Sequence, residues 1–348
     1  MRSITVILLF AALFHVRGEE QRLKARYTEE ERQLEYIKRG HKFPIEEYLP
    51  NTEGWTRLME QRLAQVRALT DSQQKWDGWI QTLTAALTMQ NFTEYGWGLT
   101  QGPPELTAAL REGIFEGFPN KEIERDIQVI DGPLNPWFIH NKKLTRRVMH
   151  EMKPILEAWS GIELLPATAY GFRLYRNESR LWMHVDRTQT HVISCIYHIA
   201  SSDNAEPWPI VIEDYAGNTN AVVLKPGDIL LYESAKNFHG RPKEFIGDWY
   251  TSVFVHYYPK NPEWQRSNHD LDSHYAIPEN WIDVVPDDRY PEITVRGTSV
   301  MEPNCPHNWC NLQDAIELEG PGVYGEVLTG DNKRYSLNLE DTEAEELQ

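Results

Sequence analysis

A His-x-Asp triplet, His184-Val-Asp186, lies at the beginning of an apolar segment of the chain. Side chains two residues apart in an extended strand point to the same face, so the His184 imidazole and the Asp186 carboxylate can bind one metal ion. A third ligand has to come from another part of the fold. His239, in the segment SAKNFHGRP, lies at the start of the expected next-to-last core strand and is the candidate.

Two imidazoles and one carboxylate leave three positions of a six-coordinate ion open. This ligand set is typical of non-haem Fe(II) oxygenases, in which the open positions accept a chelating co-substrate and then O₂. A purely structural metal site would instead be closed by four protein ligands. The alternative interpretation of His184, Asp186 and His239 is that they are ordinary surface and turn residues.

Three further histidines lie close to these residues in the sequence. His191 is interpreted as a residue of a strand edge or of the substrate side, and His256 as a structural residue of the last core strand. His198 has two open interpretations: a core histidine whose hydrogen bonds are satisfied, or a residue of the metal pocket.

The hydrophobic pattern divides the chain into a helical part and a strand-rich part. Residues 19–115 show mainly helical spacing, with Asp71 as a helix cap, and a further helix is expected over Lys143 to Trp159, bent or interrupted near Pro154. From about Ala167 the chain consists of short β-branched and aromatic runs separated by polar turns, which predicts a β-sandwich or small barrel.

The segment from Tyr170 to Tyr258 resembles the Fe(II)/2-oxoglutarate dioxygenases of the prolyl 4-hydroxylase superfamily. The matching features follow one another in the family's order: Tyr175, the triplet His184-Val-Asp186, the strand SCIYHI from Ser194 to Ile199, the Pro226-Gly-Asp228 turn, His239, Pro242 and Gly247. The resemblance covers about a quarter of the chain.

This resemblance implies an α+β fold with a jelly-roll core (a double-stranded β-helix) and N-terminal helices packed on it. The expected organisation is a signal peptide over 1–18, a mainly helical region over 19–160, the dioxygenase domain over 161–260, and an irregular extension with an acidic tail over 261–348.

The resemblance also implies a hydroxylase that uses Fe(II), 2-oxoglutarate and O₂, with ascorbate as a possible further cofactor. His184, Asp186 and His239 would then be the catalytic metal ligands. An Asp at position 186 argues against a halogenase, which needs that coordination position for its halide. A peptide, with proline as the default target, or a small molecule is the expected substrate.

The sequence departs from the family at the position of the basic residue that holds the distal carboxylate of 2-oxoglutarate, where it has Trp249. A dianionic co-substrate needs a fixed cation or strong donors. Tyr175, His198 and Arg241 are the candidates for binding it, and Arg180 and Arg187 are placed to meet an acidic substrate or co-substrate. The alternative function is a metal-binding jelly roll that binds a peptide or glycan without 2-oxoglutarate turnover.

Composition limits the class of partner. The 348-residue chain is 41% hydrophobic, which suits a globular protein, and its formal net charge of −17 weighs against nucleic acid as a partner.

The N-terminus is interpreted as a secretory signal peptide. Arg2 precedes an apolar run from Ile4 to Phe14, and cleavage after Gly18 is plausible. The alternative is an uncleaved membrane anchor. With cleavage, we expect a protein of the endoplasmic reticulum lumen or extracellular space that is not inserted in a membrane.

A secretory route permits glycans and disulfides. Asn91 and Asn177 each begin an acceptor sequon, and Cys305 and Cys310 in CPHNWC are expected to form a disulfide. A zinc knuckle with His307 as third ligand is the alternative for the two cysteines. Cys195, within an apolar strand, is interpreted as a buried small hydrophobic residue.

Overall fold

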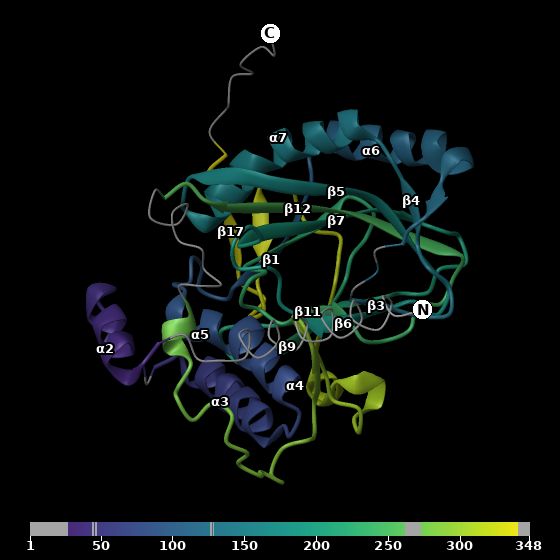
Figure 1. Ribbon diagram of the computed structural model, residues 1–348. Coiled ribbons are helices and arrows are strands. Elements are labelled where there is room, and N and C mark those ends of the chain that lie inside the picture. The colour runs from purple at the N-terminus through teal and green to yellow at the C-terminus, as the bar shows by residue number, and fades with distance from the viewer. Residues whose placement is uncertain are drawn as a thin grey trace, which may run out of the picture.

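The computed structural model describes residues 27–43, 45, 47–125, 127, 129–261 and 273–339. Two β-sheets face each other, and helices cover the outer side of each sheet (Figure 1). The fold is therefore α+β, as expected. The expected signal peptide lies outside the described residues.

The larger sheet has nine strands in the order β17-β16-β1-β10-β7-β12-β5-β4-β2. The strands are β1 (Trp97–Gln101), β2 (Glu122–Ile123), β4 (Trp137–Ile139), β5 (Leu164–Arg176), β7 (Ile193–Ser201), β10 (Asp228–Tyr232), β12 (Trp249–Pro259), β16 (Glu326–Leu328) and β17 (Arg334–Ser336).

The smaller sheet has eight strands, seven of them in the order β13-β14-β6-β11-β8-β9-β15, with β3 paired to β6. The strands are β3 (Ile130–Asp131), β6 (Arg180–His184), β8 (Ile210–Glu213), β9 (Thr219–Val223), β11 (His239–Arg241), β13 (Thr294–Arg296), β14 (Ser299–Met301) and β15 (Ile316–Glu319). Among the described strands, β15 alone pairs in parallel, with β9.

Two helices cover the outer face of the larger sheet, α6 (Pro104–Gly117) and α7 (Lys142–Ser160). Their apolar residues share one core with alternate residues of β5, β7 and β12, including Leu110, Leu156, Phe172 and Val253. The helix expected over Lys143 to Trp159 is thus confirmed, but it is not interrupted near Pro154, which lies inside one continuous helix.

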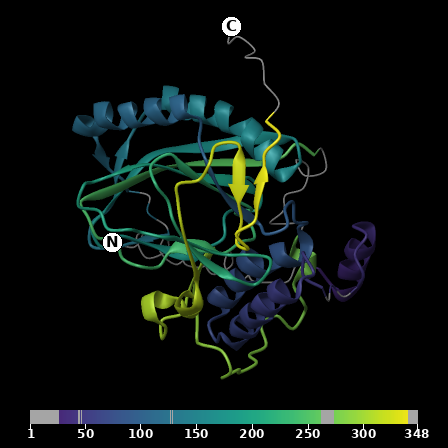
Figure 2. The same cartoon turned by 180° about the vertical axis from the view of Figure 1, so that it is seen from behind.

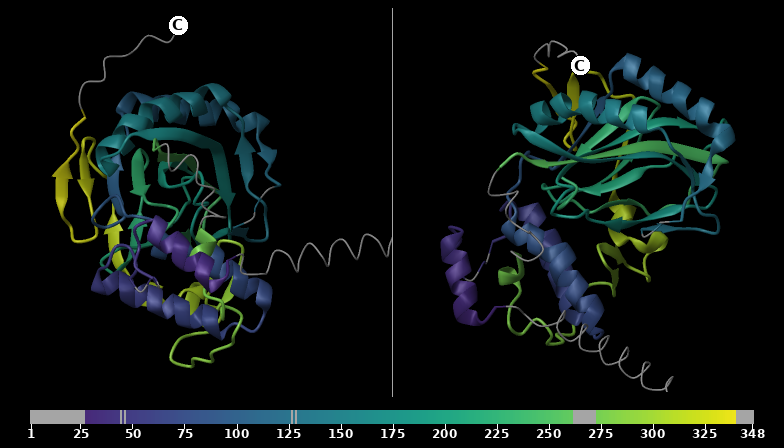
Figure 3. Two further views of the ribbon diagram at one scale, coloured as in Figure 1. Left: turned by 60° about the vertical axis from the view of Figure 1, so that its left-hand side comes forward. Right: turned by 45° about the horizontal axis from the view of Figure 1, so that its top comes forward.

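The N-terminal helices pack against the smaller sheet, as Figure 3 shows from two sides. They are α2 (Glu29–Lys38), α3 (Glu53–Ala68), α4 (Ser72–Asp77), a π-helical segment (Gly78–Leu83) and α5 (Thr84–Thr88). Asp71 caps α4 by accepting from the Gln74 backbone N–H at 2.8 Å, which confirms the expected cap. Trp55 and Trp79 pack in one core with Met183 and Val211 of the sheet.

A buried lysine fixes these helices to the loop that leads into His239. The Lys236 ammonium donates to the backbone carbonyls of Met89, at 2.8 Å, and of Leu49. Burial lowers the Lys236 pKa to about 7, and the nearby Glu233 carboxylate opposes that shift. The N-terminal region therefore helps to position the loop that precedes the third candidate ligand.

The C-terminal extension is more ordered than its sequence indicates. Short strands β13, β14 and β15 join the smaller sheet, and the β16–β17 hairpin, the yellow arrows in Figure 2, extends the larger one through β1. Strands of three or four residues have too few positions to give an alternating pattern, and their stability comes from the sheet edges that they pair with. No helix among the described residues is long and apolar enough to cross a membrane.

Candidate metal centre

The three candidate ligands converge on one point. His184 ends β6, Asp186 follows two residues later, and His239 begins β11, where it pairs directly with His184. One ligand atom of each lies within 4.8 Å of the other two. The Asp186 carboxylate oxygens lie 3.7 Å from His184 Nε2 and 4.0 Å from His239 Nε2.

Hydrogen bonds fix both imidazoles with the Nε2 atom facing this point. His184 Nδ1 donates to the Trp182 carbonyl at 2.7 Å, and His239 Nδ1 donates to the Asn237 carbonyl at 2.9 Å. Because a carbonyl only accepts, each Nδ1 carries the proton and each Nε2 keeps a free lone pair.

Burial sets the charge state of the three groups. It lowers the pKa of His184 to about 4 and that of His239 well below its usual value, so both rings are neutral, as metal ligands require. Burial raises the Asp186 pKa to about 7, against a hydrogen bond from Ser234 that lowers it. Asp186 Oδ2 is buried and has no hydrogen-bond partner among the described residues. An ion at this point would supply that partner, so the residues fit a divalent metal.

Gly240 allows the two ligand strands to approach each other. A Cβ atom at position 240 would lie 2.7 Å from the Trp182 carbonyl oxygen and 2.8 Å from that of Leu181. These contacts are closer than real Cβ atoms make, so β11 could not lie this near to β6 with a larger residue. The glycine thus helps to bring His239 opposite His184.

Two more histidines lie beside the three ligands. His256 Nδ1 is 3.6 Å from Asp186 Oδ2 and 2.8 Å from the Ser194 hydroxyl, and the His191 and His256 rings are 3.9 Å apart. His256 thus lies at the site as well as on the last core strand, because its ring lines the cavity at the ligands. Alternation along β12 is a signal that could have found it.

A cavity of about 170 Å³ adjoins the three ligands between the sheets. It is lined by the ligands, by Tyr175 and Tyr232, and by Arg173, which the sequence analysis did not single out. The Arg173 guanidinium binds the buried Glu124 carboxylate through two hydrogen bonds, of 2.6 and 2.5 Å. Arg173 and Tyr175 are two residues apart on β5, and that spacing is the signal that was available in the sequence.

The three candidate co-substrate residues lie in different surroundings. Tyr175 lines the cavity, and its buried hydroxyl has no well-aligned hydrogen-bond partner among the described residues, although the Arg173 guanidinium interacts with it. Burial raises the pKa of this hydroxyl, and the Arg173 and Arg241 charges oppose the shift. His198 and Arg241 do not line the cavity and instead pack around the Tyr250 ring.

Arg241 is a buried cation held mainly by neutral groups. Its guanidinium lies 4.5 Å from the Trp208 ring centre and 4.7 Å from that of Tyr250, and it donates to the Trp208 carbonyl and, at 3.1 Å, to the Tyr250 hydroxyl. No carboxylate of the described residues forms an ion pair with it. His198 donates from Nδ1 to the Thr251 carbonyl at 3.0 Å and stacks on Tyr250. Burial lowers the His198 pKa, and the nearby Arg241 charge lowers it further, to about 3, so the ring is neutral.

Trp249 does not face the cavity. Its ring packs against Phe118, at 5.6 Å between ring centres, and against Phe115, on the side of α6. The inward residue at this end of β12 is Tyr250, so the position that the family resemblance assigns to a cation belongs here to the outer face of the strand.

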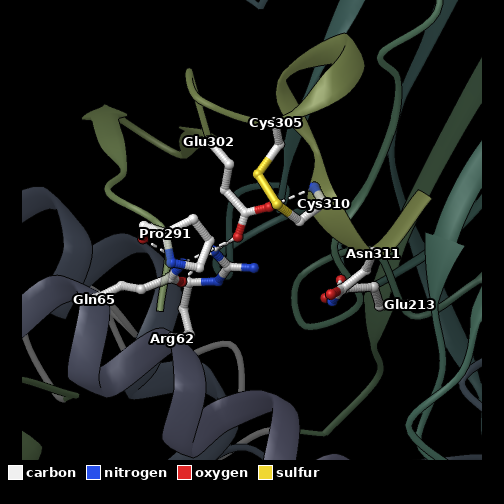
Figure 4. The surroundings of a disulfide bond; sticks show 8 residues. All are labelled: Arg62, Gln65, Glu213, Pro291, Glu302, Cys305, Cys310 and Asn311. Atoms are coloured by element: carbon white, nitrogen blue, oxygen red, sulfur yellow. Dashed lines mark hydrogen bonds and ion pairs between the residues drawn. A yellow bond between two sulfur atoms is a disulfide. The ribbon is translucent and has the colours of Figure 1, made fainter. Parts of the chain in front are cut away.

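A disulfide-linked segment of the C-terminal extension lies beside Arg62 and Gln65 of α3 (Figure 4). The structure joins Cys305 to Cys310, so neither sulfur is free for the alternative zinc knuckle. Glu302 accepts from the Cys310 backbone N–H at 2.7 Å and from Gln65 at 3.0 Å, and it pairs with Arg62.

Arg62 connects this segment to the metal centre. Its guanidinium lies 4.6 Å from the ring centre of Trp309 and 5.1 Å from that of Phe238, the residue that precedes His239. The disulfide segment, α3 and the ligand strand therefore form one packed unit.

Breaking the disulfide is expected to destabilise the fold moderately. A bond between residues five apart closes a short loop, and the chain-entropy relation gives about 2 kcal/mol for it. Urea unfolding of Cys305→Ala/Cys310→Ala should show that loss. A thiol reductant should lower the free energy of unfolding of the wild type by the same amount and should leave that of the double variant unchanged. If the reductant did not change the urea unfolding curve of the wild type, the prediction would be contradicted.

Glu213 is expected to make stability fall as the pH rises. Its buried carboxylate accepts from Asn311 at 2.9 Å and interacts with Arg62 and Trp309, yet burial outweighs these partners and raises its pKa to about 7 against a usual 4.5. The folded state therefore holds a proton that the unfolded chain releases, and the resulting stability is present below pH 4.5 and lost as the pH rises through about 7. The loss amounts to about 3 kcal/mol. Glu213→Gln should remove this pH dependence, which is measured as the difference between the free energies of unfolding in urea at pH 5 and at pH 8. Parallel pH profiles of variant and wild type would refute this.

The other modification candidates are placed as follows. Cys195 is fully buried in β7, as expected. Asn91 and Asn177 are both exposed at the surface, and their glycosylation stays a prediction.

The sequence matches no family model, and no curated protein matches it. Three solved structures illustrate what the structure search found. A prolyl-4-hydroxylase from Pseudomonas putida is 14% identical, with 48% of this chain and 94% of that chain covered and a TM-score of 0.39. AviO1 from Streptomyces viridochromogenes Tue57 is 16% identical, with 49% and 94% covered and a TM-score of 0.38. A 2OG-Fe(II) oxygenase family oxidoreductase from Burkholderia pseudomallei is 13% identical, with 49% and 88% covered and a TM-score of 0.37. These likenesses are too distant to assign the chain to a family.

Proposed function

We propose that this protein is an Fe(II)- and 2-oxoglutarate-dependent dioxygenase that hydroxylates a peptidyl, by default prolyl, or small-molecule substrate in the secretory pathway. The observation that carries the proposal is the open three-ligand set, two neutral imidazoles and one carboxylate, at the wall of a cavity between the sheets. Such a set leaves coordination positions for a co-substrate and O₂.

We assign the core to the jelly-roll class. In support, the eight consecutive strands β5 to β12 alternate between the sheets except at the β8–β9 hairpin, with β5, β12, β7 and β10 adjacent in one sheet and β6, β11, β8 and β9 adjacent in the other. This arrangement places the two ligand strands, β6 and β11, side by side.

Binding of 2-oxoglutarate is supported by an excess of buried positive charge near Tyr175. The Tyr175 hydroxyl has no well-aligned hydrogen bond among the described residues and interacts with the Arg173 guanidinium, and the Arg241 guanidinium has no carboxylate partner there. Tyr175 would donate to the distal carboxylate, and Arg241 would stabilise its charge through the low-dielectric interior. When bound, iron and 2-oxoglutarate together activate O₂ for attack on a C–H bond. The residues of the chain would hold the three ligand atoms, and the hydrogen bond from Ser234 favours the ionised form of Asp186 against the effect of burial.

A secretory location is part of the proposal. It is supported by the apolar N-terminal segment in the sequence and by the Cys305–Cys310 disulfide, which favours an oxidising compartment. The deciding measurement is localisation of the full chain in cells, together with N-terminal sequencing of the secreted protein.

The test of the activity is 2-oxoglutarate turnover by the full chain with and without Fe(II) and ascorbate. Iron-dependent release of succinate and CO₂ supports the proposal. A chain that binds iron yet fails to turn over or bind 2-oxoglutarate contradicts it.

One observation favours a second candidate, a metal-binding jelly roll that binds a peptide or glycan without 2-oxoglutarate. Arg173, the cation on the cavity wall, is already paired with Glu124, and Arg241 is not on that wall. Calorimetric titration of the Mn(II)-loaded protein with 2-oxoglutarate distinguishes the two candidate functions, because only the dioxygenase has to bind 2-oxoglutarate.

A further inference from the structure

A second, larger cavity opens onto the metal centre. Its volume is about 950 Å³, within the range of cavities that hold small ligands or a few peptide residues. It shares His184, Asp186 and Arg173 with the smaller cavity. Its other walls come from the loop after the His-x-Asp triplet and from the turn of the β13–β14 hairpin, which belongs to the C-terminal extension.

The charges on the described walls of this cavity are mainly positive. The charged residues lining it are Arg173, Arg187, Arg296 and Asp186. Asp186 is a candidate metal ligand, and the Glu124 carboxylate neutralises Arg173. Among the described residues, Arg187 and Arg296 therefore remain as two cations without a carboxylate partner.

These two arginines differ from others on the surface. Arg187 and Arg296 are exposed, and neither forms an ion pair with a carboxylate of the described residues. The Arg187 charge acts on the cavity, because together with burial it lowers the pKa of His191. By contrast, Arg180 pairs with Glu244, and Arg289 pairs with Asp287 at 2.6 Å. In a chain with a net charge of −17, two unpaired arginines at one cavity are not explained by general surface composition.

A neutral donor adds to this pattern. The side-chain nitrogen Nε2 of Gln189, which lines the same cavity, is buried and has no acceptor among the described residues. An amide N–H and two guanidinium groups can only donate hydrogen bonds, so the group that complements them is an acceptor with negative charge.

We propose that the substrate of this site carries an anionic group, a carboxylate or a phosphate, which Arg187 and Arg296 bind while the metal centre faces the C–H bond to be attacked. The part of this inference that concerns attack on a C–H bond rests on the proposed function, whereas the anion site itself needs only the two arginines. Arg187 is one residue from Asp186, so an anion held there lies close to the metal centre.

The test is calorimetric binding of short peptides that differ at one position, which is glutamate, phosphoserine or glutamine. The full chain is titrated with Mn(II) and 2-oxoglutarate present, and again with EDTA. The glutamate or phosphoserine peptide should bind at least about tenfold more tightly than the glutamine peptide, as expected for one charge-assisted hydrogen bond or more. Which anionic peptide binds more tightly distinguishes a carboxylate from a phosphate.

The Arg187→Ala/Arg296→Ala variant should lose this preference. Arg289→Ala is the matched control, because Arg289 is exposed and does not line the cavity. Unfolding curves of both variants check that they fold. Equal binding of the three peptides, no measurable binding of any, or an unchanged preference in the double variant overturns the inference. An anion preference that persists in EDTA while 2-oxoglutarate fails to bind would instead remove only the proposed function.

Discussion

Replacing Asp186 with alanine is expected to abolish Fe(II) binding and, with it, all 2-oxoglutarate turnover. Asp186 supplies the charged ligand, and its buried Oδ2 has no other partner among the described residues. Loss of groups that merely orient ligands costs about 10- to 100-fold in metal affinity, so loss of a ligand should cost more. Fe(II) or Mn(II) affinity measured by titration, beside succinate release, checks the result. His184→Ala should behave in the same way.

Two comparisons make this outcome specific to the ligands. His191→Ala removes a histidine that is near the site but outside the three-ligand group, and it should keep metal binding. The metal-free Asp186→Ala protein should be at least as stable as metal-free wild type, because a buried carboxylate without a full set of partners is costly. If the His184→Ala/Asp186→Ala protein consumed 2-oxoglutarate at the wild-type rate, the assignment would be wrong.

Arg241→Met is expected to weaken 2-oxoglutarate binding by about 10- to 100-fold with little change in stability. The fold-change follows from the loss of a charge-assisted interaction worth about 1.5–3 kcal/mol. Stability should change little because methionine fills similar space and removes a buried cation that has no carboxylate partner among the described residues. Calorimetric titration with 2-oxoglutarate gives the first quantity, and urea unfolding gives the second.

Arg173→Met is the matched comparison and should show the opposite pattern. It leaves the buried Glu124 carboxylate without its two hydrogen bonds from Arg173, so a loss of about 3–5 kcal/mol in stability is expected. If Arg173→Met lost 2-oxoglutarate binding while Arg241→Met kept it, Arg173 would be the co-substrate cation and the role of Arg241 would be rejected.

Much of the metal centre could be predicted from the sequence because it depends on local geometry. His184 and Asp186 share a face since side chains alternate along an extended segment, whatever the rest of the fold does. The α7 helix and the Asp71 cap were predictable for the same reason, because hydrophobic spacing and capping act within a few residues. Cys305 and Cys310 are close enough in sequence to meet across one turn.

The direction of the residues on β12 was less accessible. Counting from His239 placed Trp249 at the cation position, yet Trp249 packs against α6 and Tyr250 faces inward. Counting fails because a loop separates the two strands, and a slip of one residue exchanges the faces. The pairing of β5 with β12 also shifts its register, because Arg173 pairs with Ser252 and Tyr170 with Phe254. Tyr170 and Arg173 therefore both reach the cavity although they are three residues apart on β5.

The sequence by itself determined the ligand types, the alternating strands that carry them and the helices that cover the sheets, since all of these follow from interactions between near neighbours in the chain. Only the tertiary structure decided that Glu124 neutralises Arg173, that Arg241 is left without a carboxylate among the described residues, and that Arg296 reaches the cavity beside Arg187. Each of these features depends on residues that are far apart in sequence. They depend on how strands of the two sheets and the C-terminal extension pair at their edges, which local patterns do not encode.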